Sequence, residues 1–338
     1  IKTIDEVVVI GYGKSSRKEI TGSIATLKSE NFNQGSFPNA AGLLQGKIAG
    51  LSVVNSNGSD PQANYEIILR GTNTLTSRQG PLIIIDGVAG EDLKNINFQE
   101  VESIDVLKDG SAAAIYGTRG TNGVIIITTK QARKGKATVE YNGIATIQVA
   151  PRMVKNLTAD EFRYAINTFA PNKVNSIYDA NTDWFGAITR DMPFSHKHNL
   201  AISGGNEELS HRTIINLEQN QGLLKNNNLN KLLARTNIQQ KALKGKLTLN
   251  YNSFYSMRKS NPANYDIFYQ AFIHNPTEPV YDPDNRLSGG YKRVDGINYY
   301  NPVAMLNEEK RDSETDDLGG NVRATLNIPF VTGLKWDN

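Results

Sequence analysis

The sequence of 338 residues contains no cysteine, no long apolar run and almost no surplus of charge. Without cysteine, the chain has no disulfides, thiolate nucleophiles or cysteine metal sites. Hydrophobic residues make up 38% of the chain, and no run approaches the roughly 18 to 20 residues that a membrane-spanning helix needs. The 37 basic and 34 acidic residues leave a net charge of +3, which argues against a protein that coats nucleic acid.

The sequence also lacks the usual marks of an enzyme or of a secreted precursor. Its start has no basic segment followed by an apolar core, so we expect an intracellular or an already trimmed protein. The four histidines show no metal-binding spacing, and the pair Asp316 and Asp317 is expected in a charged loop. We therefore find no catalytic constellation and expect no metal and no cofactor.

The opening stretch EVVVIGYGKSS looks at first like a phosphate-binding loop after a buried strand. Such a loop requires GxxxxGK[ST], which would place its first glycine at the position of Val8. It also requires a helix directly after Lys14, and KSSRKEITGS predicts none. The stretch is better explained as an exposed segment with a high propensity for β-structure.

Up to Lys134, short apolar runs alternate with segments rich in small residues. The runs IILRG, LIIIDG and VIIITTK are continuous, which predicts strands buried on both faces of a small mixed sheet. The segments NAAGLLQGKIAG and SAAAIYG predict helices between them. This part of the chain is therefore expected to form a small α+β domain.

After Lys134, apolar and polar residues alternate strictly in segments of about ten residues. In KATVEYNGIATIQV, for example, Val139, Tyr141 and Ile147 share one face, while Glu140 and the other polar residues share the opposite one. Tight turns (SGGNEE, ALKGK, PFVTG) alternate with long segments at 150–195 and roughly 257–315. A soluble sandwich also alternates, but short connections at one end and long ones at the other favour a transmembrane β-barrel.

From residue 136 onward we count about seven such strands. An odd number cannot close a bacterial barrel, and an open sheet edge is not tolerated in lipid. We therefore expect either that the chain is the front part of a longer polypeptide or that its strands close with other chains.

Several motifs resemble the plug domain of SusC/RagA-type TonB-dependent outer-membrane transporters: DEVVVIGYG, LLQGKIAGLSVV, ILRGTNTL, PLIIIDGV and VESIDVLKDGSAAAIYGTRGTNGVIIITTK. The resemblance extends over residues 5–145 and is looser beyond them. It implies an α+β plug domain inside a transmembrane antiparallel β-barrel of about 22 strands, of which this chain would supply the first six or seven. The implied domains are a leash at 1–20, the plug at 21–134 and the first part of the barrel at 135–338.

The resemblance also implies roles for particular residues. The segment that would bind the energy-coupling protein TonB, by adding a strand to its sheet, consists of Asp5, Glu6, Val7, Val8, Val9, Ile10, Gly11, Tyr12 and Gly13. A plain plug strand is the alternative. The residues expected in plug motifs or in contacts between plug and barrel are Arg70, Gly71, Asp86, Gly87, Lys108, Asp109, Tyr116, Gly117, Arg119, Gly120 and Gly123.

For several of these residues the sequence supports a simpler role as well. Arg70 and Arg119 could pair with acidic groups lining the barrel or remain solvated. Asp86 before Gly87 favours a tight turn at a strand end. The GxxGxxG of residues 117–123 precedes a strand, the reverse of a dinucleotide-binding fingerprint, so glycine turns with positive φ are expected there.

The resemblance implies energised import of a bulky nutrient across the outer membrane of a Gram-negative bacterium. Its expected partners are TonB, a SusD-like surface lipoprotein, outer-membrane lipid and a glycan cargo, with a peptide as the second choice and no nucleic acid. The long segments would supply cargo or lid contacts through Trp184, Tyr265, Tyr269 and Tyr291, or these aromatic residues would form the cores of the loops. A soluble P-loop ATPase and a secreted β-rich adhesin are the rivals from other classes.

Overall fold

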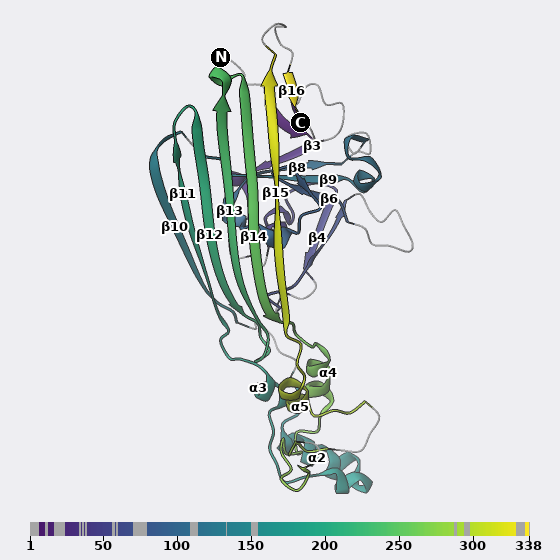
Figure 1. Ribbon diagram of the computed structural model, residues 1–338. Coiled ribbons are helices and arrows are strands. Elements are labelled where there is room, and N and C mark those ends of the chain that lie inside the picture. The colour runs from purple at the N-terminus through teal and green to yellow at the C-terminus, as the bar shows by residue number, and fades with distance from the viewer. Residues whose placement is uncertain are drawn as a thin grey trace.

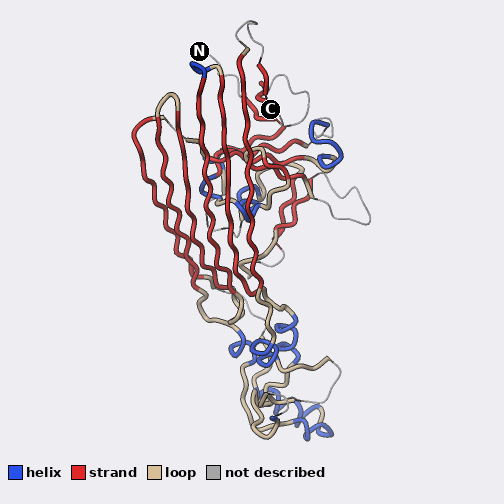
Figure 2. Tube along the Cα trace, in the orientation of Figure 1, coloured by secondary structure: helices blue, strands red, loops and turns tan. Residues whose placement is uncertain are grey.

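The computed structural model describes residues 7–10, 13–16, 24–33, 35, 37, 39–55, 58, 60–69, 80–108, 114–132, 134–149, 155–286, 289–293, 298–328 and 335–337. Three parts can be distinguished in Figures 1 and 2: a small mixed-sheet domain, a tall curved sheet and a group of helices beyond one end of that sheet. We call them the plug, the wall and the loop body.

The plug is built around a five-stranded sheet with the strand order β3-β8-β9-β6-β7. Its strands are β3 (Ile24–Lys28), β6 (Leu82–Ile85), β7 (Val88–Ala89), β8 (Val101–Leu107) and β9 (Val124–Thr129). β6 and β9 run parallel, and the other neighbours are antiparallel. Ile85, Ile104, Ile125 and Ile127 are almost fully buried, so the runs LIIIDG and VIIITTK form the predicted core strands.

The run IILRG was wrongly assigned to the same sheet. Its first three residues lie in β5 (Tyr65–Leu69), which pairs with β4 (Leu51–Asn55) in a separate two-stranded sheet. Leu51, Val53 and Leu69 pack into the plug core, while Ser52 on the opposite face is exposed. With one face on the core, this ribbon needs no place in the larger sheet.

The described helices of the plug are short 3-10 helices. These are η1 (Ser29–Asn31), η2 (Ala40–Leu44), η3 (Leu93–Asn95), η4 (Phe98–Glu100) and η5 (Ala114–Gly120). The helix predicted over residues 39–50 is therefore limited to η2. Asn39 caps its start by accepting a hydrogen bond from the Ala41 amide at 2.9 Å, and Gly46 with φ of 73° turns the chain after its end.

The wall is a seven-stranded antiparallel sheet in sequence order. Its strands are β10 (Gly135–Ile147), β11 (Phe194–Gly205), β12 (Leu209–Gln221), β13 (Asn228–Ala242), β14 (Leu247–Asn261), β15 (Ser313–Asn327) and β16 (Lys335–Asp337). Asp316 and Asp317 lie within β15, so the expectation of a charged loop there was wrong. One end of the wall has tight connections, including η7 (Leu243–Gly245), and the other carries the long ones (Figure 1).

The two faces of the wall differ as the alternation predicts. On the outer face, Ile215 and Leu217 of β12 are exposed by 42% and 50%. On the inner face of β13, in contrast, Arg235 and Asn237 are buried because the plug covers them. Residues exposed in this way on a β-sheet are those that would face lipid in a barrel wall.

The loop body contains the helices α2 (Ala159–Phe169), α3 (Trp184–Ile188), α4 (Asp266–Ile273), α5 (Pro302–Glu308) and the 3-10 helix η6 (Pro171–Ser176). The caps of three of these α-helices explain where they begin. Thr158 and Glu161 form a capping box at α2, Asp183 caps α3, and Asn301 caps α5 ahead of Pro302.

At the start of the described chain, β1 (Val7–Ile10) pairs antiparallel with β2 (Gly13–Ser16). No third strand joins this hairpin among the described residues. Within the same residues, no helix is both long enough and apolar enough to cross a membrane.

Candidate functional site: the interface between plug and wall

Arg235 of β13 is the centre of the contact between plug and wall. Its guanidinium lies 3.4 Å from the Asp86 carboxylate, pairs with the Glu91 carboxylate, and donates to the Asn95 carbonyl at 3.2 Å. The side chains of Arg235, Asp86 and Glu91 are all at most 2% exposed. On the wall side, the guanidinium lies 4.9 Å from the centre of the Phe254 ring. A single wall cation thus holds two plug carboxylates in a buried contact.

The turn between β6 and β7 brings Asp86 to this position. Asp86 and Gly87 adopt φ of 49° and 90°, as a tight hairpin turn requires. The Asp86 carboxylate accepts hydrogen bonds from the Thr129 amide at 2.9 Å and its hydroxyl at 2.7 Å. From the wall, Asn321 donates to the Asp86 carbonyl at 2.9 Å. A side chain at position 87 would meet Asn321 at 2.8 Å, so this turn requires glycine for close approach as well as for its φ.

A second ion pair joins Glu100 of the plug to Arg212 of β12. The Arg212 guanidinium donates through Nε at 2.9 Å and lies within 2.8 Å through Nη2. Asn199 of β11 donates to the other Glu100 oxygen at 2.8 Å. Glu140 of β10 reaches the same guanidinium at 3.2 Å. Two neighbouring strands of the wall, β11 and β12, therefore bind one plug carboxylate, and Glu140 of β10 contacts the arginine of this pair.

A third group of charges lies nearer to the loop body. Arg258 of β14 lies 3.5 Å from Asp92 of the plug and 2.7 Å from Asp317 of β15. Lys197 of β11 pairs with Glu218 at 2.7 Å and donates to the plug carbonyl of Phe37 at 2.9 Å. The plug is thus bound along its height by side chains of β11 to β15.

In these pairs the positive charge lies on the wall and the negative charge on the plug, which is the reverse of the predicted arrangement. The sequence suggested plug arginines against barrel acids, whereas the described pairs join plug acids to wall arginines. Arg119 is exposed, and its guanidinium lies beside Gly90 of the plug. Arg70 lies outside the described residues. Sequence reasoning missed Glu91, Asp92 and Glu100, although Arg235 could have been noticed as a charge on the inward face of KLLARTNIQQ.

Burial raises the pKa of Asp86 and raises the pKa of Glu91 to about 7, although Arg235 acts in the opposite direction on both. A single guanidinium cannot neutralise two buried carboxylates, so uptake of a proton by this cluster is favourable. The folded pKa of Glu91 lies above its ordinary value of 4.5. The resulting stabilisation is fully present below about pH 4.5 and is lost as the pH rises through about 7.

We therefore expect the plug to be released more easily at pH 8 than at pH 5.5. A fluorophore at Glu102→Cys, an exposed plug position, would report plug unfolding in urea in the full-length protein. The free energy of plug unfolding should fall by about 2 kcal/mol between the two pH values. Glu91→Gln should remove most of this dependence. An equal dependence in Glu91→Gln would show that another group takes up the proton.

The other predicted plug residues serve the plug itself. Lys108 donates to the Ala49 carbonyl at 2.8 Å, and Tyr116 packs against the smaller apolar cluster of Ile84, Leu107, Val124 and Ile126. Gly117 and Gly123 have φ of 65° and 89°, so the glycine-turn interpretation is confirmed there. At Gly123 a side chain would collide with Leu69 at 2.2 Å. Gly120 is buried at the end of η5. Gly71 and Asp109 lie outside the described residues.

The predicted TonB-binding segment is described only in part. Val7–Ile10 form β1 and Gly13 begins β2, whereas Asp5, Glu6, Gly11 and Tyr12 lie outside the described residues. β1 is a strand with one neighbour in the described part of the chain, which leaves its other edge available to a further strand.

The aromatic residues predicted to contact cargo or a lid divide into buried and exposed ones. Trp184 and Tyr291 are 3% and 8% exposed within the apolar core of the loop body, and Trp184 donates to the Asn275 carbonyl at 3.0 Å. The ring of Tyr265 stacks on Phe268 at 6.4 Å. Tyr269 is 60% exposed. For Trp184 and Tyr291 burial favours the second of the two stated alternatives, a place in the core of the loops, whereas Tyr269 is open to a contact with cargo or a lid.

The loop body is held together by packed polar contacts as well. The His274 ring stacks on Tyr299 with the centroids 4.0 Å apart, and Tyr299 donates to the Glu278 carboxylate at 3.0 Å. Burial lowers the pKa of His274 to about 4, so the imidazole is neutral near pH 7. In the described part of the chain, no three His, Asp or Glu side chains are arranged to hold a metal ion. The described parts of the long segments thus pack together around a shared core.

Residues 16–124 match the family described as the TonB-dependent Receptor Plug Domain. The chain is 32% identical to TonB-dependent receptor SusC of Bacteroides thetaiotaomicron, in a match covering 98% of this chain and 36% of that protein. It is 31% identical to TonB-dependent receptor P26 of Formosa agariphila, covering 99% and 34% respectively. The chain thus spans about a third of the length of these relatives.

The fold is similar to that of a solved structure, the RagAB peptide importer in its open-open state. The TM-score is 0.77 at 22% identity, covering 98% of this chain and 41% of that one. At this identity the likeness concerns the fold. A plug domain bound against a curved antiparallel sheet defines the class of plugged transmembrane β-barrels. Within that class, the chain carries the plug domain and part of the barrel wall of a SusC-like TonB-dependent receptor.

Proposed function

We propose that the whole protein imports a bulky nutrient across the outer membrane of a Gram-negative bacterium, driven by TonB. The observation that carries this proposal is the plug fixed to the inner face of the wall through Arg235, Arg212 and Arg258. A domain held in a lumen by a few buried ion pairs blocks passage at rest. It can also be displaced by breaking a limited number of contacts without unfolding the wall.

In this proposal β1 is the segment that TonB binds. A strand with an available edge can extend the sheet of a partner, with affinity supplied by main-chain hydrogen bonds. A pull on β1 is transmitted along the chain to β3 of the plug sheet. Arg70, Gly71 and Asp109 remain proposed members of the plug motifs, on the strength of the sequence resemblance.

For the cargo we propose an oligosaccharide, enclosed between the barrel and a SusD-like surface lipoprotein. The loop body supports this proposal because it exposes aromatic rings that could stack on sugars or pack against a lid, namely Tyr164, Tyr269, Tyr281 and Tyr300. The similarity to a peptide importer supports an oligopeptide as the second candidate.

Uptake measurements would test this function. Cells that express the full-length protein and its lipoprotein should accumulate a labelled oligosaccharide only when TonB is functional. Equal accumulation in cells without TonB would contradict energised import. Preferential accumulation of labelled oligopeptides would instead support the second candidate.

A further inference from the structure

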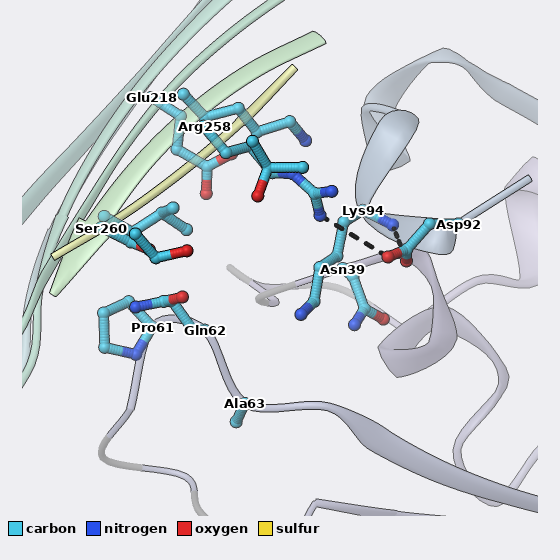
Figure 3. Close-up of a pocket in the computed structure, with 13 residues that line it drawn as sticks. Asn39, Pro61, Gln62, Ala63, Asp92, Lys94, Glu218, Arg258 and Ser260 are labelled. Atoms are coloured by element: carbon cyan, nitrogen blue, oxygen red, sulfur yellow. Dashed lines mark hydrogen bonds and ion pairs between the residues drawn. The ribbon is translucent and has the colours of Figure 1, made fainter. Parts of the chain in front are cut away.

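A cavity of about 240 Å³ lies between the plug and the wall. Its wall residues include Lys231 near the start of β13, Arg258 near the end of β14 and Thr315 near the start of β15. These are the strand ends that lead into the loop body, so the cavity lies on the side of the plug that faces the long loops. Figure 3 shows Arg258 from the wall and Lys94 and Asp92 from the plug around this space.

Three basic side chains meet at the cavity: Lys94 of η3, Lys231 and Arg258. The two acidic side chains there are already engaged. Glu218 pairs with Lys197 at 2.7 Å and accepts from Asn220. Asp92 accepts from the Lys94 amide at 2.9 Å and faces Arg258 at 3.5 Å. The cations therefore exceed the acids available to neutralise them.

The hydrogen-bonding groups left over at this cavity are donors. In the described part of the chain, the ammonium groups of Lys94 and Lys231 have no ion pair within 4.0 Å, and Lys231 is only 8% exposed. Gln62 Nε2 and Arg258 Nε are buried, also without a hydrogen-bond partner among those residues. Burial lowers the pKa of Lys94, although the carboxylates of Asp92 and Asp60 act in the opposite direction. Burying such groups unpaired is costly, so the site favours a ligand that brings acceptors and negative charge.

We propose that this cavity binds the carboxylate or sulfate groups of an acidic oligosaccharide. This proposal rests on the proposed function and names the class of its cargo. Anionic oxygens accept charge-assisted hydrogen bonds from Lys94, Lys231 and Arg258 together. The cavity is smaller than the usual site for a whole small ligand, so it accommodates one charged unit of a longer chain.

The position of the cavity connects cargo to the plug contact. Lys94 and Asp92 belong to the same short segment as Glu91 and Asn95, which bind Arg235. An anion that binds Lys94 and competes with Asp92 for Arg258 acts directly on this segment. Occupation of the lumen is thereby communicated to the ion pair that holds the plug.

Titration calorimetry on the purified full-length protein would test the cavity. The probes are tri-galacturonate, its neutral counterpart tri-galactose, and tri-glutamate as an acidic peptide. We expect tri-galacturonate to bind at least about ten-fold more tightly than tri-galactose, with affinity falling as salt is raised. Lys231→Met and, independently, Lys94→Gln should each weaken tri-galacturonate about ten-fold and leave tri-galactose unchanged. Lys259→Met, which removes a wall cation paired with Glu314, is the matched control and should have no effect.

Equal binding of the acidic and neutral sugars, or unchanged affinity in both lysine variants, would overturn the proposal. The second variant covers the case in which Lys231→Met fails to fold. Tighter binding of tri-glutamate than of tri-galacturonate would overturn the assignment to a glycan. None of these binding measurements involves TonB. A negative result would therefore refute the anion site alone, whereas uptake by cells without TonB would refute energised import.

Discussion

Arg235→Met should free the plug from the wall. Asp86 and Glu91 would then share a buried site without the cation that they both contact. Removing one partner of a buried ion pair costs about 3 to 5 kcal/mol, because the remaining charge stays uncompensated. Protonation of Glu91, whose pKa burial already raises to about 7, would recover part of this loss.

The reactivity of a cysteine placed at position 256 would measure the release of the plug from the wall. Ser256 of β14 is fully buried, and the chain contains no cysteine of its own that would react in parallel. In the full-length protein with any other cysteines removed, Ser256→Cys should react with a maleimide about 100-fold faster when Arg235→Met is added. Lys259→Met serves as the control, because it removes a half-exposed wall cation. Surface pairs of that kind contribute at most about 1 kcal/mol.

The double variant Arg235→Met with Glu91→Gln should react more slowly than the two single effects predict together, since the second change removes a charge that the first left unpaired. Strict additivity would mean that Arg235 and Glu91 are not coupled. Unchanged labelling in Arg235→Met would show that the plug is held by other contacts.

Deleting residues 5–13 from the full-length protein should abolish uptake and leave the affinity for cargo nearly intact. The segment includes β1, which lies in a two-stranded hairpin outside the main plug sheet. An isolated hairpin of this size is marginally stable, so a partner strand can engage or open it at little cost. We therefore expect the rate of transport to fall more than about ten-fold while the affinity for cargo stays unchanged.

Two point variants separate the main chain of β1 from its side chains. Val8→Pro should reproduce the deletion, because proline removes an N–H donor and does not fit a hydrogen-bonded ladder. Val8→Ala retains the main-chain donors and should transport at close to the normal rate. Normal uptake in the deletion strain would contradict the role of this segment, and equal defects in Val8→Pro and Val8→Ala would contradict recognition through the main chain.

The sequence by itself determined the long strands of the wall and their inner and outer faces. The two-residue alternation predicted the long strands of the wall, with Tyr141 and Ile147 on the outside and Asn142 opposite, because successive side chains of a strand point to opposite faces. Caps such as Thr158 and Asn301 likewise act within a few residues of the helices they begin. Signals of this kind are local, so they can be read without knowing the fold.

Only the tertiary structure decided which charges meet and which aromatic residues are buried. Arg235 and Glu91 are separated by 144 residues in the chain, and their contact depends on how the plug is seated against the wall. Trp184 reaches a carbonyl 91 residues away. Its aromatic character indicated an apolar contact but could not tell an exposed face from a core. A side chain's type fixes what it can bond, whereas the neighbour that satisfies it is supplied by distant segments brought together in the fold.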